Sequence, residues 1–231
     1  MKRYRHLFFD LDHTLWDFRT NSRAVLTTLY DELGLAARGV PTVDELILCY
    51  EEVNVGLWKR YENGKIDKEV MRVLRFRNTL LYFEIRDERL AEHMGDAYLE
   101  RTPRMKGLFP GTLEVLNDLQ PNYGLHLITN GFEATQSTKL KSSGISDLFE
   151  HVVCSESVGA SKPDPRIFRK AMKLARTNAK ESLMIGDNIG ADMHGARNVG
   201  MDHAHFAPEG NADPLATYRL LHLDELRLLL L

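Results

Sequence analysis

Two aspartates two positions apart, Asp10 and Asp12, are the residues of this chain best placed to carry out chemistry. They follow Leu7-Phe8-Phe9, a short apolar run typical of a strand buried on both faces of a parallel sheet. Residues i and i+2 of an extended chain project to the same side, and open α/β sheets bind ligands at the carboxyl ends of their strands. The two carboxylates could therefore share nucleophilic and acid–base roles, or hold a divalent cation.

Further polar groups follow the next apolar runs. Thr129, Asn130 and Gly131 end one run at the start of a predicted helix, where a hydroxyl and backbone N–H groups suit a phosphate oxygen. Lys162 lies in a proline-containing loop after the run at 151–154 and could present a fixed positive charge to a phosphoryl group. An ordinary turn and a surface lysine are the alternative interpretations.

A second pair of acids follows the run Leu183-Met184-Ile185. Gly186 permits a tight turn, and Asp187 could join the first two aspartates around Mg²⁺. Asp192 could orient that ligand or a bound water, or could simply be a negative charge favoured at a helix N-terminus. Each motif is weak alone. Four strand ends that carry an acid pair, a hydroxyl, a lysine and a second acid pair favour one catalytic site.

The elements that must position these groups fall into two blocks. Apolar residues recur at helical spacing over 19–35, 42–63, 67–83 and 87–101, which predicts a compact helical bundle. From about residue 109, predicted strands and helices alternate along the chain. The predicted strands are 125–129, 151–154, 182–186 and 202–206. A first predicted helix ends at about residue 119, and the others are 133–143, 164–176 and 190–198. This alternation predicts right-handed crossovers and a parallel sheet, with the bundle inserted after its first strand.

Composition excludes several classes of protein. The chain has 231 residues and a net charge of −3, which gives no support for nucleic-acid binding. We expect no secretory signal and no membrane span, and two free thiols, Cys49 and Cys154, in a reducing cytoplasm. His203 and His205 have no cysteine or carboxylate cluster beside them, so a zinc site is not predicted there.

The motifs resemble those of a known family, the haloacid dehalogenase-like (HAD) hydrolase superfamily. The segments that carry the resemblance occur in the family's order: Asp10-Leu11-Asp12-His13-Thr14, Thr129-Asn130-Gly131, Lys162-Pro163, and Gly186-Asp187 with Asp192. The resemblance implies an α/β fold, a Rossmann-like parallel sheet of strand order 5-4-1-2-3 with an inserted helical-bundle cap. We expect the catalytic core to comprise residues 1–15 and 104–231, and the cap residues 16–103.

The same resemblance implies a role for each motif residue. Asp10 would attack phosphorus and form an aspartyl-phosphate, and Asp12 would protonate the leaving oxygen and then activate water. Thr129 and Lys162 would hold phosphate oxygens. Mg²⁺ would be bound by Asp10, the carbonyl of Asp12 and Asp187. The implied partner is a small phosphomonoester, for a protein that is either a monomer or a homodimer.

Within the family, Asp12 indicates phosphoryl transfer, because haloacid dehalogenases are expected to lack an acid there. The segments 12–18, 130–140 and 155–163 are similar to the pyrimidine 5′-nucleotidases of the YjjG-like branch. We therefore expect a nucleoside monophosphate 5′-nucleotidase. The alternatives are a phosphatase of small acids or sugar phosphates, such as phosphoglycolate phosphatase, and a non-catalytic binding protein on the same scaffold.

A stripe in the predicted bundle could read the leaving group. Tyr50, Asn54, Trp58 and Glu62 recur every four residues, so they share one face of a helix that offers aromatic rings and an amide. Trp16 and Phe18 lie close to the acid pair in sequence and are two further candidates for substrate contact. The alternative is that these side chains only pack within the bundle or at the hinge.

Overall fold

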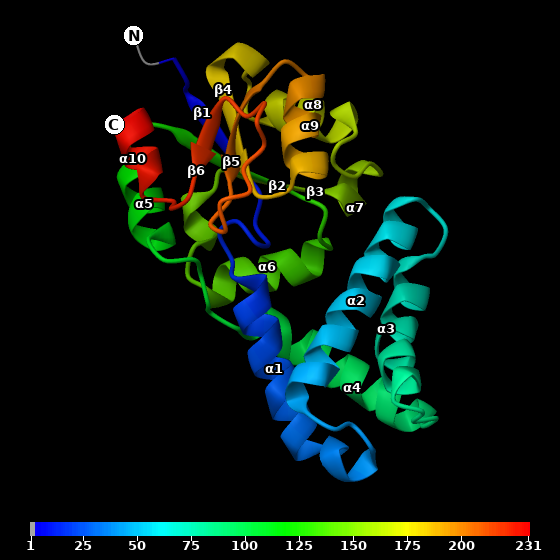
Figure 1. Cartoon of the computed structure of the whole chain (residues 1–231). Coiled ribbons are helices and arrows are strands. Elements are labelled where there is room, and N and C mark those ends of the chain that lie inside the picture. The colour runs from blue at the N-terminus through cyan, green and yellow to red at the C-terminus, as the bar shows by residue number, and fades with distance from the viewer. Residues whose placement is uncertain (1–2) are drawn as a thin grey trace. The chain divides into compact units, whose positions relative to one another are not determined.

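The structure, a computed structural model, describes residues 3–231. It divides the chain into two compact units (Figure 1). Met1–Phe18 and Lys106–Leu231 form the first, here called the sheet unit, and Arg19–Met105 form the second, here called the helical unit. Across the described part of the chain, no helix is both long enough and apolar enough to cross a bilayer.

The sheet unit contains one parallel sheet. Its six strands, counted over residues 3–231, are β1 (His6–Phe9), β2 (Gly124–Thr129), β3 (His151–Cys154), β4 (Ser182–Gly186), β5 (Asp202–Phe206) and β6 (Tyr218–Leu220). They are arranged in the order β3-β2-β1-β4-β5-β6. The predicted α/β class and the five-strand order 5-4-1-2-3 are confirmed, and β6 adds an edge strand that the sequence pattern did not predict.

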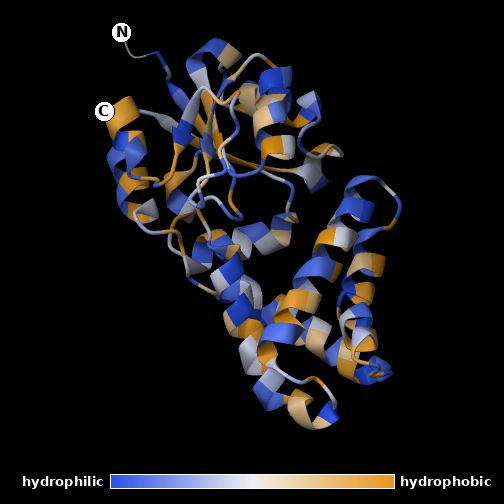
Figure 2. Ribbon diagram, viewed as in Figure 1, coloured by the Kyte–Doolittle hydropathy of each residue, from blue (hydrophilic) through white to orange (hydrophobic). Residues whose placement is uncertain are grey.

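Helices lie on both sides of this sheet. They are α5 (Thr112–Leu119), α6 (Glu133–Ser142), α7 (Ser155–Val158), α8 (Pro165–Leu174), α9 (His194–Asn198) and α10 (Glu225–Leu230), with a π-helical turn at Ile189–Met193. Figure 1 shows α8 and α9 on one side and α5 with α10 on the other. A buried core cluster between the sheet and α8 includes the fully buried side chains of Phe8, Ile128 and Phe168. Figure 2 shows hydrophobic residues on the strands as well as on the helices. Covering both faces explains why the strands are apolar on consecutive positions.

The helical unit comprises most of α1 (Phe18–Glu32), with α2 (Val43–Glu62), α3 (Lys68–Tyr82) and α4 (Glu88–Arg101). The last three begin at capping residues, since the side chains of Thr42, Asp67 and Asp87 each accept a hydrogen bond from the backbone N–H three residues on. A separate apolar core, which includes Leu26 and Leu80, joins the helices. The four predicted helices are confirmed, with ends within three residues of those expected.

Candidate active site

Asp10 and Asp12 lie in a tight loop at the carboxyl end of β1. The N–H of Asp10 donates to the carbonyl of Ile185 at 2.8 Å, which continues the β1–β4 ladder one residue past β1. The chain then folds back, because the N–H of His13 donates to the carbonyl of Trp16 at 3.0 Å. These backbone bonds fix both aspartates at the edge of the sheet where the sequence predicts a ligand.

Lys162 lies between two buried carboxylates. Its Nζ donates to Asp10 Oδ1 and to Asp192 Oδ1, each at 2.6 Å, and its side chain is 3% exposed. Asp187 completes the group, since one oxygen from each of Asp10, Asp187 and Asp192 lies within 4.8 Å of the other two. A single lysine cannot neutralise three carboxylates, so this cluster has a surplus of negative charge when all its acids are ionised.

Burial, and to a smaller extent this surplus of negative charge, raises the pKa values of the three acids. Desolvation raises the pKa of Asp10 to about 7 although Lys162 opposes it, and desolvation with the charge of Asp10 raises the pKa of Asp187 to about 6. Burial also raises the pKa of Asp192 against the attraction of Lys162. A divalent cation would relieve this repulsion, and carboxylate oxygens are the ligands that Mg²⁺ prefers. The residues present therefore fit such an ion.

Asp12 lies in a different electrostatic environment. Gln136 Nε2 donates to Asp12 Oδ2 at 2.9 Å, and Lys139 Nζ donates to Asp12 Oδ1 at 2.5 Å. Burial raises the pKa of Asp12, but the charge of Lys139 and these two hydrogen bonds outweigh it and hold the pKa below its ordinary value. The two carboxylates of this loop therefore lie in different environments, Asp10 beside Lys162 and Asp12 beside Lys139.

Thr129 lies at the carboxyl end of β2 with its hydroxyl oxygen already engaged. This oxygen accepts from Gln136 Nε2 at 2.7 Å and from the N–H of Gly131 at 3.1 Å, so its own hydrogen can be donated to a ligand. A Cβ on Gly131 would come within 2.3 Å of Gln136 Nε2, which explains the glycine. The amide of Asn130 binds the backbone of Lys162 through two hydrogen bonds, at 2.7 and 3.2 Å. The Asn130 side chain therefore positions Lys162, and the predicted phosphate contact through the backbone N–H groups after Thr129 stays a prediction.

Asp192 is fully buried and is not a solvated charge at a helix terminus. Besides binding Lys162 through Oδ1, it accepts through Oδ2 from the N–H of Asn188 at 3.1 Å. A Cβ on Gly186 would lie 2.3 Å from Asp192 Oδ2, so only glycine permits this close packing. Of the two sequence interpretations of Asp192, the structure favours the one in which it orients neighbouring site residues.

Three residues next to the site were not predicted. Gln136 and Lys139 project from α6 onto Asp12, and His205 holds the backbone of Asp187. His205 Nδ1 accepts from a backbone N–H at 2.8 Å, so its Nε2 carries the proton and donates to the carbonyl of Asp187 at 2.7 Å. The sequence signal for the first two was their shared face at i and i+3 on the helix after Thr129.

The structure corrects the expectation for Trp16. The Trp16 ring is fully buried, and Lys139 Nζ lies 4.5 Å from its centroid, so the ring supports Lys139 and does not line a substrate site. Phe18 is partly buried, with Lys139 Nζ 5.5 Å from its centroid. Both aromatic rings thus lie within cation–π distance of the lysine that binds Asp12.

The predicted stripe on α2 passes from the core of the helical unit to its surface. Tyr50 is fully buried against the rings of Phe76 and Tyr98, so packing explains it. Asn54 is 8% exposed, and within residues 3–231 its Oδ1 has no hydrogen-bond partner. Trp58 is partly exposed, and its ring meets that of Tyr61 edge-on at 5.8 Å. Asn54 and Trp58 remain the two members suited to contact a ligand.

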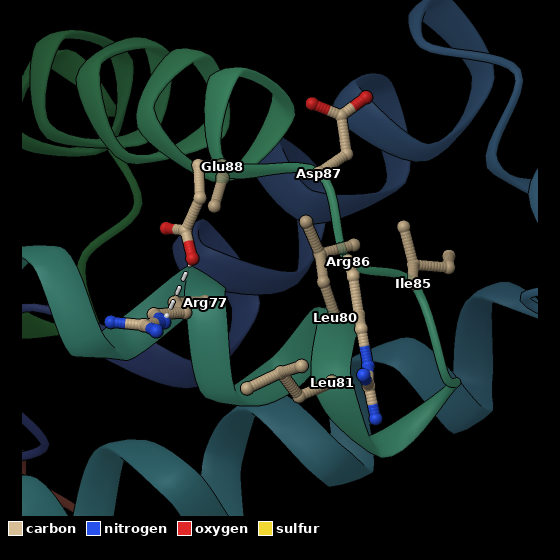
Figure 3. Close-up of a pocket in the computed structure, with 8 residues that line it drawn as sticks. Arg77, Leu80, Leu81, Ile85, Arg86, Asp87 and Glu88 are labelled. Carbon is tan, nitrogen blue, oxygen red and sulfur yellow. Dashed lines mark ion pairs between the residues drawn. The ribbon is translucent and has the colours of Figure 1, made fainter.

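A pocket of about 280 Å³ lies elsewhere in the helical unit. Figure 3 shows it next to an ion pair between Arg77 Nε and Glu88 Oε1, which are 3.0 Å apart. Its walls are formed by the end of α3, the following loop and the start of α4: Arg77, Leu80, Leu81, Ile85, Arg86, Asp87, Glu88 and Ala91. None of the residues predicted for catalysis or substrate contact is among them.

The raised pKa values predict how stability depends on pH. Between about pH 4 and pH 8, the native protein without metal binds more protons than the unfolded chain, because the pKa values of Asp10 and Asp187 are raised. This contribution to stability is complete below the unfolded pKa values and is lost as pH rises through about 6 and 7. The Asp187→Asn variant should show a smaller decrease in the free energy of unfolding as pH rises. Urea unfolding in EDTA at several pH values measures it, and equal slopes in both proteins would contradict the prediction.

Several known proteins are similar to this chain over nearly its whole length. A family model for haloacid dehalogenase-like hydrolases matches residues 4–200. The pyrimidine 5′-nucleotidase PynA of Streptococcus pneumoniae is 30% identical and covers 96% of this chain and 93% of its own. The pyrimidine 5′-nucleotidase YjjG of Escherichia coli is 30% identical and covers 95% of this chain and 96% of its own. A crystal structure of YfnB from Bacillus subtilis bound to magnesium is similar at a TM-score of 0.87 and 27% identity, over 99% of both chains.

Proposed function

This chain belongs to the haloacid dehalogenase-like hydrolases, and we propose that it is a phosphomonoesterase that acts on nucleoside 5′-monophosphates, pyrimidine nucleotides above all. The observation that carries the proposal is the placement of Asp10 and Asp12 in one loop, where Lys162 donates to Asp10 and Lys139 donates to Asp12. Transfer of a phosphoryl group from an ester needs both a nucleophile and a proton donor for the leaving oxygen. The match of PynA and YjjG to nearly the whole chain supports the nucleotide as substrate.

In the proposed reaction, an oxygen of Asp10 forms a bond to phosphorus as the bond to the leaving oxygen breaks. Asp12 gives its proton to that oxygen, so the product is a free alcohol. Water then attacks the phosphorus of the aspartyl-phosphate, Asp12 accepts the water's proton, and inorganic phosphate leaves with Asp10 restored. The two half-reactions return both carboxyl groups to their starting states.

The remaining core residues would bind and orient the phosphate. Lys162, now shared by Asp10 and Asp192, would offer its charge to a phosphate oxygen, and Thr129 would donate its free hydroxyl hydrogen. Mg²⁺, held by Asp10, the Asp12 carbonyl and Asp187, would neutralise charge on the phosphoryl group. In this assignment the sheet unit is the catalytic core, and the helical unit is a cap that recognises the leaving group.

Lys139 makes the acid–base role of Asp12 testable. Because Lys139 lowers the pKa of Asp12, a Lys139→Met variant should raise that pKa and move the pH profile of kcat to higher pH. Lys141→Met, which removes an exposed lysine from the same helix, is the matched control and should leave the profile in place. An unmoved profile in Lys139→Met, with turnover retained, would contradict the role assigned to this pair.

Trp58 tests whether the helical unit reads the base. A Trp58→Ala variant should raise KM for uridine monophosphate, with a stacking contribution of about 1–3 kcal/mol. Turnover of p-nitrophenyl phosphate and the melting temperature should hardly change, because neither requires a base contact. Equal losses on both substrates would instead assign Trp58 to packing with Tyr61.

The substrate class is tested by phosphate release from a panel of phosphomonoesters. With Mg²⁺, we expect uridine and thymidine monophosphates to be hydrolysed well and phosphoglycolate and sugar phosphates poorly. EDTA should abolish turnover, Mg²⁺ should restore it, and Ca²⁺ should inhibit because its looser coordination alters the position of Asp10. Preference for phosphoglycolate would establish the alternative phosphatase, and binding of monophosphates without any release would establish the non-catalytic alternative.

A further inference from the structure

Three of the chain's nine histidines gather at the end of the sheet opposite Asp10. His6 and His151 are the first residues of β1 and β3, and His126 lies in β2 between them. The sheet register pairs His126 with both His151 and Phe8, so alternation places His6, His126 and His151 on one face. At about 3.3 Å per residue, His6 lies about 13 Å from Asp10, so this cluster is separate from the catalytic edge.

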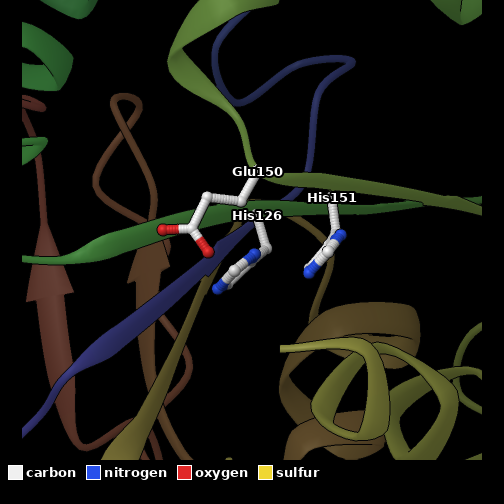
Figure 4. A group of neighbouring side chains, drawn as sticks. All are labelled: His126, Glu150 and His151. Carbon is white, nitrogen blue, oxygen red and sulfur yellow. The ribbon is translucent and has the colours of Figure 1, made fainter. Parts of the chain in front are cut away.

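A carboxylate completes the cluster. Figure 4 shows the Glu150 carboxylate directed toward the ring of His126, with His151 on the neighbouring strand. One ligand atom from each of His126, Glu150 and His151 lies within 4.8 Å of the other two. His6 approaches from the other side, with its Nδ1 3.0 Å from His126 Nε2. Four side chains with metal-binding atoms thus surround one position in the sheet.

Gly124 leaves open the space on which these side chains converge. A Cβ at this strand position would lie 2.7 Å from His6 Nδ1, 3.0 Å from Glu150 Oε1 and 3.1 Å from His126 Nε2. Three potential ligand atoms therefore lie next to a single volume that any other residue would fill. Glycine weakens a strand, and in a strand it often marks a place where another group approaches closely.

His126 supplies an independent sign of a missing ligand. The His126 side chain is fully buried, and among residues 3–231 its Nδ1 has no hydrogen-bond partner. A buried polar nitrogen without a partner is destabilising, so a native protein normally satisfies it. Desolvation, with His6 and His151 nearby, lowers the pKa of His126 to about 3, so the ring is neutral at physiological pH. Neutral imidazole is the form that binds metal ions.

We propose that His126, Glu150 and His151, with His6 as a fourth group within reach, bind a transition-metal ion, Zn²⁺ in the first place. Imidazole nitrogens with one carboxylate suit Zn²⁺, whereas Mg²⁺ prefers a shell of oxygens such as the one around Asp10. The ion would join β1, β2 and β3, the three strands that carry these histidines. The protein would then hold two chemically different metals at opposite edges of its sheet.

Zinc binding to the full-length protein tests this site. Titration against a chromogenic chelator should be performed in the Asp187→Asn background with excess Mg²⁺, so that the acidic cluster does not compete for Zn²⁺. Glu150→Gln and His151→Gln change half-exposed or exposed side chains and should each weaken Zn²⁺ binding by at least about tenfold. His93→Gln, an exposed histidine of the helical unit, is the matched control and should bind Zn²⁺ as its parent does.

Two further readouts distinguish coordination from loose surface binding. Co²⁺ substituted for Zn²⁺ should give the visible spectrum of a nitrogen- and oxygen-ligated site, and His151→Gln should change that spectrum. Gly124→Ala keeps every ligand but fills the space between them, so it should weaken binding as strongly as loss of a ligand. The proposal is overturned if the background protein binds no Zn²⁺ in competition with the chelator, or if Glu150→Gln, His151→Gln and His93→Gln bind it equally.

Discussion

An Asp10→Asn variant is expected to lose at least about three orders of magnitude in turnover of p-nitrophenyl phosphate. The amide nearly preserves the volume of the carboxylate but removes both the nucleophilic oxygen and a metal ligand. Lys162 keeps its contact with Asp192, at 2.6 Å, so the buried charge of the lysine remains paired and the fold should persist. Steady-state phosphate release, with circular dichroism to verify folding, measures the effect.

Asp147→Asn is the matched control, because it makes the same chemical change at an exposed aspartate of the sheet unit. It should retain the turnover of the parent. If folded Asp10→Asn keeps a tenth of the parent's turnover, Asp10 is not the nucleophile.

The second large effect is expected from Lys162→Met, which should reduce both activity and stability. Two buried carboxylates, Asp10 and Asp192, would lose their shared partner, and breaking a buried ion pair on one side costs about 3–5 kcal/mol. Their pKa values should rise further, so the loss of unfolding free energy should grow with pH. Urea unfolding in EDTA at about pH 6 and about pH 8 measures this change.

Lys173→Met, an exposed lysine of α8, is the control and should unfold like the parent at both pH values. A Lys162→Met protein as stable as the parent at the higher pH would show that the two carboxylates do not depend on this lysine. Retained phosphate release in the same variant would remove Lys162 from phosphate binding.

Residues that follow strands could be predicted from the sequence because the signal is local. Asp10 and Asp187 directly follow strands β1 and β4, and Thr129 ends strand β2. Parallel strands bring their carboxyl ends to one edge. Lys162 follows β3 only after the short helix α7, yet the same rule placed it at that edge. The chemistry of these residue types at such a place then indicates the family and the site.

What the sequence did not reveal depends on contacts between distant residues. Gln136 and Lys139 lie 124 and 127 positions from Asp12, so the sequence shows that they share a helix face but not that this face meets Asp12. The position of Trp16 in the sequence predicts a contact with substrate, but its side chain is buried in the core beside Lys139. Strand β6 spans three residues, too short for a periodic pattern, and it forms by pairing with β5.

The central claim, that phosphoryl transfer passes through Asp10, is tested most directly by looking for the phosphoryl group on that residue. Asp12→Asn should slow release of the group, so rapid acid quench of this variant with Mg²⁺ and p-nitrophenyl phosphate should trap the intermediate. Peptide mapping by mass spectrometry is expected to find one phosphoryl group on the peptide that contains Asp10. Release of p-nitrophenol without any phosphorylated Asp10, or with the group on another residue, would contradict the account.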